Sequence, residues 1–242
     1  ALLPYLLPEA ADAAPAPLSV LILGLAGGVI SRQYHALFGE RLALIDGVEV
    51  DPLMVELARR HFGLVAAHHA RLEVHVLDGR VFLRATRRQY DIVVVDAYAH
   101  QIYLPPHMAT VSFFEETRQA LRAGGVVALN ASAHYPGEGL VPRLVNTVAR
   151  VFGEAFLGAA GPGNFMLFAF KERADAWPPA RLEADRLPEA LRPLWAGFVA
   201  PGQVLRFRDD PAAPVFTDDD CPVEVLASRD LARAAAAYRT AP

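Results

Sequence analysis

The sequence predicts an α/β fold: a mostly parallel, doubly wound sheet of about seven strands with helices on both faces. The main observation is that, from Leu18 onward, apolar runs of strand length alternate with amphipathic stretches of helix length. This alternation is typical of a parallel sheet covered on both faces. The second observation is size and composition, since 242 residues of which 53% are hydrophobic can bury a substantial core.

The expected elements follow one another regularly. Strands are expected at residues 18–24, 43–50, 72–77, 90–96, 125–131 and 164–171, with a weaker one at 155–159. Helices are expected at residues 28–38, 52–62, 79–87, 110–122 and 138–152. Pro52 stands at the first helical position after a strand, where its missing N–H costs nothing. Gly124 and Gly125 are expected to end the helix before the fifth strand.

Changes in composition divide the chain into three parts. Residues 1–17 are rich in Ala and Pro and are expected to form a lead-in. Residues 18–171 make up the α/β core. Residues 172–242 are expected to be a decorating segment packed on that core, with short helices around 180–197 and a final helix at about 223–239.

Composition also argues against several kinds of partner. A formal charge of -4 does not fit a broad nucleic-acid surface. The apolar stretch from Leu18 to Ile30 is well under the roughly 20 residues of a membrane span. The single cysteine, Cys221, forms no intramolecular disulfide and fits a reducing cytoplasm. No metal site is expected, and His68-His69 is interpreted as a surface loop.

Two successive strand ends carry the first candidate site residues. Gly24, Ala26 and Gly27 belong to a turn in which glycines let the backbone approach a ligand closely, although such glycines also serve packing alone. Glu49 ends the next strand and can accept hydrogen bonds from both hydroxyls of a ribose. The alternative is a solvated acid that caps the next helix, a role that Asp51 before Pro52 fits well.

The third and fourth strands also end in acids. Asp78 could accept the exocyclic amino group of an adenine while the N–H of Gly79 addresses a ring nitrogen, or Asp78 could cap the following helix. Asp96 follows a buried apolar run at the position where substrate would meet cofactor. Because ligands of open α/β sheets bind outside the carboxyl ends of the strands, three acids and a glycine turn on four strand ends predict one site.

These residues resemble the spermidine synthase family, whose core has the Rossmann-like fold of S-adenosylmethionine-dependent methyltransferases. The resemblance rests on the glycine turn, Val48-Glu49-Val50-Asp51, Asp78-Gly79-Arg80, Asp96 leading into Leu104-Pro105-Pro106, and Thr217 to Glu224 far downstream. It implies that Glu49 holds ribose, Asp78 holds adenine and Asp96 is the catalytic base. The implied cofactor-binding residues are Gly24, Ala26, Gly27, Glu49, Val50, Asp78, Gly79 and Asp96.

The resemblance also implies the ligands: decarboxylated S-adenosylmethionine or S-adenosylmethionine, with methylthioadenosine or S-adenosylhomocysteine as product. The sequence departs from the family on the acceptor side, since Ala99 and Ala26 stand where the family has acids, and its N-terminal β-rich segment has no room before Leu18. Without those carboxylates, the site would bind the two charged groups of a diamine much more weakly. The expected acceptor loop contains Tyr98, His100, Gln101 and Tyr103 and suggests a more neutral or aromatic amine.

Several functions remain open at this point. The leading hypothesis is aminopropyl transfer to a small-molecule amine, or another nucleophile, that is not an ordinary diamine. A methyltransferase is the alternative, because Ala26 does not repel the carboxylate of intact S-adenosylmethionine. A non-catalytic nucleoside-binding member is a further alternative. A nicotinamide dehydrogenase fits less well, since Ala26 replaces the second glycine of G-x-G-x-x-G and Asp78 has no role. A homodimer is expected by analogy.

Overall fold

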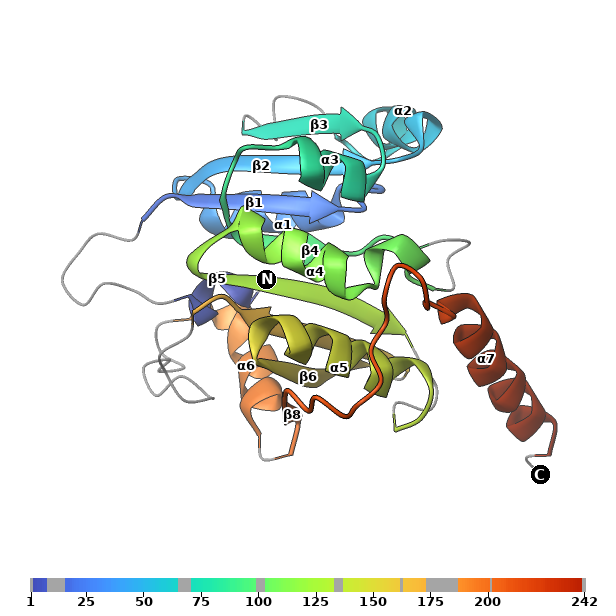
Figure 1. Cartoon of the computed structure of the whole chain (residues 1–242). Coiled ribbons are helices and arrows are strands. Elements are labelled where there is room, and N and C mark those ends of the chain that lie inside the picture. The colour runs from blue at the N-terminus through green and yellow to red at the C-terminus, as the bar shows by residue number, and fades with distance from the viewer. Residues whose placement is uncertain are drawn as a thin grey trace.

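The computed structural model describes residues 2–7, 16–64, 71–98, 103–132, 137–161, 163–172, 187–200 and 202–240. Within these residues, eight strands form one sheet with helices on both faces (Figure 1). The strands are β1 (Leu18–Leu23), β2 (Leu42–Glu49), β3 (Leu72–Val76), β4 (Tyr90–Val95), β5 (Leu121–Ser132), β6 (Glu154–Gly161), β7 (Asn164–Phe170) and β8 (Val204–Arg208). The helices are α1 (Val29–Phe38), α2 (Pro52–His61), α3 (Gly79–Ala85), α4 (Val111–Ala120), α5 (Leu140–Phe152), α6 (Arg192–Val199) and α7 (Val223–Thr240), with short 3-10 turns at Leu3–Leu6, Pro106–Met108 and Glu189–Leu191.

The strand order of the sheet is β3-β2-β1-β4-β5-β7-β6-β8. The pairs from β3 through β5 are parallel, whereas β7 is antiparallel to both β5 and β6. The first strand, β1, lies in the interior of the sheet. The chain then runs outward through β2 and β3 and crosses back to β4 on the other side of β1. The gap between the carboxyl ends of β1 and β4 is therefore the topological switch point, where such sheets bind ligands.

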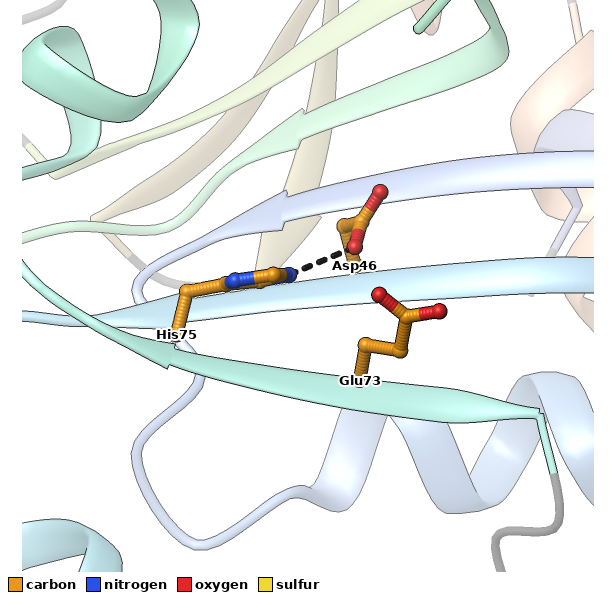
Figure 2. Close-up of side chains that lie close together, drawn as sticks. All are labelled: Asp46, Glu73 and His75. Carbon is orange, nitrogen blue, oxygen red and sulfur yellow. Dashed lines mark hydrogen bonds and ion pairs between the residues drawn. The ribbon is translucent and has the colours of Figure 1, made fainter. Parts of the chain in front are cut away.

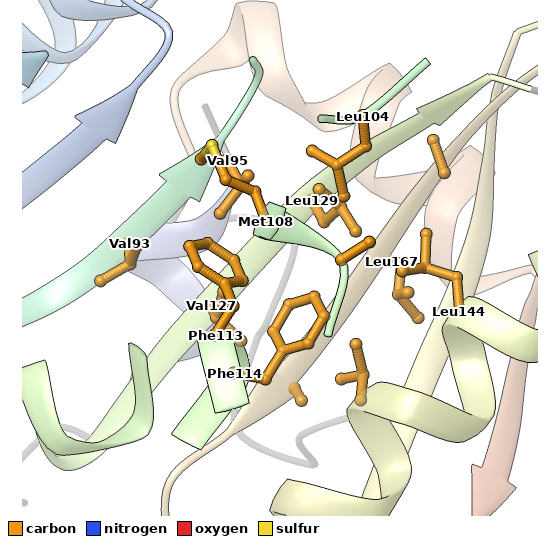
Figure 3. Close-up of a cluster of buried hydrophobic side chains, with 14 of the residues drawn as sticks. Val93, Val95, Leu104, Met108, Phe113, Phe114, Val127, Leu129, Leu144 and Leu167 are labelled. Atoms are coloured by element: carbon orange, nitrogen blue, oxygen red, sulfur yellow. The ribbon is translucent and has the colours of Figure 1, made fainter. Parts of the chain in front are cut away.

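Burial on both faces explains why the strands are apolar throughout. In β5, Val127 and Leu129 pack in one core cluster with Phe113 of α4 (Figure 3). Val126 and Ala128, which alternate with them along the strand, lie on the opposite face in a second cluster that includes Trp195 of α6. Since successive side chains of a strand point to opposite faces, a sheet covered on both sides needs apolar residues at consecutive positions. The predicted mostly parallel, doubly wound α/β fold is confirmed.

The prediction for Gly124 and Gly125 was wrong. Helix α4 ends at Ala120, and Leu121 is already extended and pairs with Tyr90 of β4. The two glycines lie inside β5, where the N–H of Gly124 donates to the carbonyl of Lys171 and the Lys171 N–H donates to the carbonyl of Gly125. Gly124 has a φ of 74°, so it supplies a left-handed bend within the strand instead of a helix cap.

The C-terminal third differs from the expected helical segment. Residues 204–208 form β8, which pairs antiparallel with β6 at the edge of the sheet. Helix α6 covers 192–199, while the expected helical residues 180–186 lie outside the described part. Helix α7 buries Val223 and Ala227 near its start and then extends away from the sheet (Figure 1). In the described residues, no helix combines the length and the apolar character that crossing a membrane requires.

Candidate functional site

Four strand ends meet at one edge of the sheet. Because β3, β2, β1 and β4 are parallel neighbours, Asp78, Glu49, the turn after Leu23 and Asp96 all lie at the carboxyl edge. Backbone hydrogen bonds continue the ladders into this edge: the N–H of Gly24 donates to the carbonyl of Val48 at 2.9 Å, and the N–H of Asp96 donates to that of Leu23 at 2.8 Å. The predicted residues thus lie along one edge of the sheet, with the glycine turn and Asp96 at the switch point itself.

The glycine turn fits tightly against the end of β4. Gly24 has a φ of 95°, and a Cβ at this position would lie 2.4 Å from the carbonyl oxygen of Asp96. Only glycine therefore allows the two strand ends to approach so closely. The side chain of Arg32 on α1 holds the turn from behind, because it donates to the carbonyl oxygens of Gly27, at 3.1 Å, and of Phe62.

Glu49 and Asp51 divide two tasks that the sequence left open. Asp51 caps α2, since its Oδ1 accepts from the N–H of Leu53 at 2.8 Å. Glu49 is oriented across the turn: its Oε2 accepts from the N–H of Ala26 at 2.9 Å and its Oε1 from the N–H of Asp51 at 3.1 Å. Each carboxylate oxygen can accept a second hydrogen bond, so Glu49 is fixed in place and keeps capacity for two hydroxyl donors.

Asp78 performs the capping role and also contacts a residue that sequence reasoning missed. Its Oδ1 accepts from the N–H groups of Arg80 and Val81 at 2.9 and 3.0 Å, and so caps α3. Its Oδ2 lies 2.9 Å from Nε2 of His107. Burial alone would raise the pKa of Asp78, but the hydrogen bonds from Val81, His107 and Arg80 together lower it. Asp78 is therefore a fixed carboxylate at the rim.

Gly79 has a packing role in the structure. A Cβ there would lie 3.1 Å from the terminal methyl group of Met108. Met108 belongs to the 3-10 turn whose His107 contacts Asp78, so Gly79 lets this turn approach α3 closely. The proposed contact of the Gly79 N–H with a nucleobase is neither required nor opposed by this packing.

Asp96 is joined to β5 by Asn130, a second residue that sequence reasoning missed. Nδ2 of Asn130 donates to Oδ1 of Asp96 at 3.0 Å, and the hydroxyl of Tyr98 donates to the Asn130 carbonyl at 2.9 Å. Burial, reinforced by the charge of Asp96, raises the pKa of Tyr98 to about 12, so its hydroxyl stays a neutral donor. The side-chain oxygen of Asn130 is buried and has no hydrogen-bond partner among the described residues. A signal was present, since Asn130 is the polar residue that follows the apolar run of a fifth strand.

A small apolar cavity opens beside Asn130. Its lining includes Tyr98, Tyr103, Leu104, Asn130, Leu144 and Val223. The hydroxyl of Tyr103 is hydrogen-bonded to Glu224 in the first turn of α7. Of the expected acceptor loop, Tyr98 and Tyr103 therefore lie at this cavity, while Ala99, His100 and Gln101 lie outside the described residues.

A buried arginine connects two of the motifs on which the resemblance rests, Asp78-Gly79-Arg80 and the segment from Thr217 to Glu224. The side chain of Arg80 is 7% exposed and donates to both oxygens of Glu116, at 3.0 Å each, and of Asp218, at 2.8 and 3.2 Å. It also donates to the carbonyl of His107 at 2.9 Å. The hydroxyl of Thr110 adds a 2.6 Å bond to Asp218. The C-terminal segment is thereby fixed next to the Asp78 side of the edge.

One other polar cluster has the composition of a metal site. Ligand atoms of Asp46, Glu73 and His75 lie within 4.8 Å of one another, and Nε2 of His75 is 2.6 Å from Asp46 (Figure 2). A cation already bridges the carboxylates, because Arg88 donates to Asp46 at 2.7 and 2.9 Å and to Glu73 at 2.8 Å. The hydroxyl of Tyr90 donates to Asp46 as well. We interpret this cluster as an ion-pair network that neutralises the buried charge of Asp46.

The fold and this edge define a doubly wound α/β protein with an acidic site at its switch point. Residues 9–157 match the family model of the spermine/spermidine synthase domain, and the chain belongs to that family.

Two relatives and one solved structure illustrate the similarity. A probable polyamine aminopropyl transferase of Bifidobacterium longum is 32% identical over 226 residues, which are 86% of this chain and 48% of that protein. Putrescine N-methyltransferase 2 of Nicotiana tabacum is 30% identical over 141 residues, which are 57% of this chain and 39% of that protein. The chain thus spans half or less of the length of these relatives. A probable spermidine synthase of Corynebacterium glutamicum shares the fold, with a TM-score of 0.62, 20% identity, and coverage of 86% of this chain and 75% of that one.

Proposed function

We propose that this protein is a transferase that moves an aminopropyl group from decarboxylated S-adenosylmethionine to an amine other than an ordinary diamine. The observation that carries the proposal is the meeting of Glu49, Asp78 and Asp96 at one edge of the sheet, around the turn that contains Gly24. Membership of the spermine/spermidine synthase family supports the reaction class. The proposal requires no metal ion.

The residues present fit an adenosine group. Glu49 would accept the two ribose hydroxyls with the capacity left by its bonds to Ala26 and Asp51. Asp78 would accept the exocyclic amino group of adenine at Oδ2, beside His107. Val50 is 65% exposed directly after Glu49 and would offer the base an apolar contact. The backbone of Gly27 and the N–H of Gly79 would complete the cradle.

In the proposed reaction, Asp96 is the base. At neutral pH an aliphatic amine is almost wholly protonated, with a pKa of about 10.4 for a lysine-like group, and must lose a proton before it attacks. Asp96 would accept that proton. The nitrogen lone pair then bonds to the CH₂ carbon beside the sulfonium, the carbon–sulfur bond breaks with its electrons passing to sulfur, and methylthioadenosine leaves. Holding the two substrates in line would supply much of the acceleration.

The surroundings of Asp96 support an acceptor with an uncharged body. The wall beside Asn130 is formed by Leu104, Leu144 and the two tyrosines, so a second ammonium group packed against it would face mainly apolar side chains. Glu224, which contacts the Tyr103 hydroxyl, is a carboxylate at this wall that could meet a second ammonium group. A monoamine with an alkyl or aryl group is therefore the expected acceptor class.

Methyl transfer from intact S-adenosylmethionine is a second candidate, and Ala26 favours it. This residue lies in the glycine turn with its N–H on Glu49, and it brings no negative charge toward the carboxylate of the intact cofactor. The tobacco relative is named a methyltransferase, which shows that the similarity reaches both reaction classes.

Calorimetry and product analysis test these proposals together. Methylthioadenosine, S-adenosylhomocysteine and both cofactors are titrated into the protein, and products formed with benzylamine or putrescine are then weighed by mass spectrometry. An aminopropyl adduct supports the first candidate and a methyl adduct the second. Asp96→Asn should abolish turnover and leave methylthioadenosine binding within about twofold, because the base does not hold the nucleoside. If the protein binds none of these four compounds, both candidates are refuted.

Glu224→Gln tests the acceptor class, with Asp219→Asn in the same exposed segment as its control. Turnover of benzylamine should be equal in the two variants. A loss confined to putrescine in Glu224→Gln would show that Glu224 binds a second ammonium group, and the proposed monoamine would then be wrong.

A further inference from the structure

The strand β3 leaves one row of backbone groups open at the edge of the sheet. β3 and β8 are the terminal strands of the described sheet, and β3 forms its upper edge in Figure 1. The carbonyl of Arg71 and the N–H of Leu77 both bond to β2, so the odd-numbered residues between them direct their backbone groups inward. Because this direction alternates along a strand, the N–H and C=O groups of Leu72, Val74 and Val76 point outward.

The residues of this outward row are all apolar. Leu72 and Val74 are half-buried and pack with Ala58 of α2 in a small core cluster, whereas Val76 is 49% exposed. Within the described residues, no hydrogen bond uses their backbone N–H or C=O groups. The edge of β3 therefore combines open backbone groups with apolar side chains, which is the composition of a strand that another strand can join.

The opposite edge of the sheet is protected by charge. The N–H of Asp209 bonds to the carbonyl of Gly153, so the even-numbered residues of β8 direct their backbone groups outward. These residues include Arg206 and Arg208, and charged side chains at such positions are a common defence against edge-to-edge pairing. A second β8 laid antiparallel around Arg206 would bring like charges together, and β3 has no such obstacle at its outward positions.

We propose that β3 pairs antiparallel with β3 of a second copy of this chain, about a two-fold axis at Val74. In this register every outward N–H and C=O group of the two strands is paired. Val74 lies opposite Val74 of the second copy, and Val76 lies opposite Leu72. On the other face of the sheet, Glu73 lies opposite His75 of the second copy, so a carboxylate meets an imidazole and no like charges face each other.

The symmetry of this register is the reason for choosing a second copy as the occupant. A two-fold interface uses the same patch on both subunits, so the patch must complement itself. β3 does so in its backbone groups, in its apolar side chains and in the Glu73–His75 pair. Because the paired strands are antiparallel, the carboxyl edges of the two copies lie on opposite sides of the joined sheet, and both candidate sites keep their own edge.

Sedimentation velocity over a series of protein concentrations measures the dimer Kd. Val76→Lys and Leu205→Lys are a matched pair, since each replaces an apolar side chain of an edge strand, 49% and 50% exposed. The unchanged protein and Leu205→Lys should form dimers with the same Kd. In Val76→Lys the Kd should rise at least about tenfold, because each lysine would lie opposite the apolar Leu72 of the second copy at two symmetric places.

Cysteine cross-linking tests the register itself and does not depend on how the lysine variants fold. Val74→Cys places two thiols at the two-fold axis, where the Cα atoms of a hydrogen-bonded pair are about 5.5 Å apart, a spacing that a disulfide can span. Oxidation should convert this variant into a covalent dimer on a non-reducing gel, and dithiothreitol should reverse it. Leu205→Cys should stay uncrosslinked, and it controls for the native Cys221.

Three results would each overturn the inference. They are an unchanged protein that is monomeric at every concentration, equal Kd values for Val76→Lys and Leu205→Lys, and a Val74→Cys protein that forms no covalent dimer where the unchanged protein is dimeric. None of these measurements involves a nucleoside or an amine, so their outcome is independent of the proposed reaction.

Discussion

Replacement of the nearly buried Arg80 by methionine should destabilise the protein more than the same replacement of the exposed Arg84. Methionine keeps most of the aliphatic stem of Arg80 and removes the guanidinium that joins Glu116, Asp218 and the carbonyl of His107. The change therefore removes a nearly buried cation that joins two carboxylates from different segments of the chain. The hydrogen bonds of Glu116 and Asp218 raise the pKa of Arg80 further, so the group is charged at every accessible pH.

The magnitude follows from how much of the network is buried. Removing one partner of a fully buried ion pair costs about 3–5 kcal/mol. The side chain of Arg80 is 7% exposed, but those of Glu116 and Asp218 are 20% and 46% exposed, and Arg84 and Thr110 continue to contact them. We therefore expect a loss of about 3 kcal/mol in the free energy of unfolding, at the lower end of that range. For a chain of this size the loss corresponds to a fall in Tm of about 6–12 °C.

Urea and thermal unfolding of Arg80→Met and Arg84→Met measure this difference. Arg84 also contacts Glu116, but its side chain is 58% exposed, so its loss should cost at most about 1 kcal/mol.

The network also predicts that stability depends on pH. Hydrogen bonds from Arg80 and Thr110 hold the pKa of Asp218 far below its ordinary range. Asp218 therefore stabilises the fold above its unfolded-state pKa of about 4, and this contribution is lost as pH falls toward the folded-state value. Equal stability of the two variants, or an unchanged acid limb in Arg80→Met, would refute the reasoning.

Three further predictions concern single sites. Gly24→Ala should lower the unfolding free energy by about 2–4 kcal/mol in urea titrations and abolish turnover, because the new methyl would overlap the Asp96 carbonyl at a left-handed φ. Asp46→Asn should cost about 1–3 kcal/mol in the same assay, because the buried end of the network loses its charge while Arg88, whose side chain is 44% exposed, keeps Glu73; an unchanged unfolding free energy would contradict the ion-pair interpretation. Burial raises the pKa of the Cys221 thiol to about 11, so iodoacetamide at pH 8 should alkylate it at least about tenfold more slowly than in urea-unfolded protein, as mass spectrometry would show.

Local patterns were sufficient to predict the sheet and its carboxyl edge. The strand that ends at Glu49 and the strand that ends before Asp96 could be placed because buried parallel strands are apolar at consecutive positions. Asp51 and Pro52 marked the start of α2, and Asp51 is indeed its cap. The bend at Gly124 could not be predicted, because a glycine pair ends a helix as readily as it bends a strand.

Contacts between distant segments could not be read from the sequence. Asn130 and Asp96 are 34 residues apart, and His107 and Asp78 are 29 residues apart. Their pairing depends on which strands are neighbours and on the path of the chain after β4. The strand β8 was missed for a related reason, since Val204–Arg208 is a short edge strand with exposed and half-buried side chains and lacks the apolar run of a central strand.

The two ends of the candidate site are held by different side-chain contacts. On the nucleoside side, Asp218 of the C-terminal segment holds Arg80, Arg80 holds the carbonyl of His107, and the imidazole of His107 contacts Asp78. A change at Asp218 should therefore reach Asp78 through fixed side chains, because each link is a hydrogen bond of 2.9 Å or shorter in the structure. On the acceptor side, Asp96 depends on Asn130 of β5 alone among the described residues that donate to it by side chain. The same C-terminal segment also reaches the other end of the proposed site, because Val223 lines the cavity beside Asn130 and Glu224 contacts the Tyr103 hydroxyl, so a change in this segment should affect both ends.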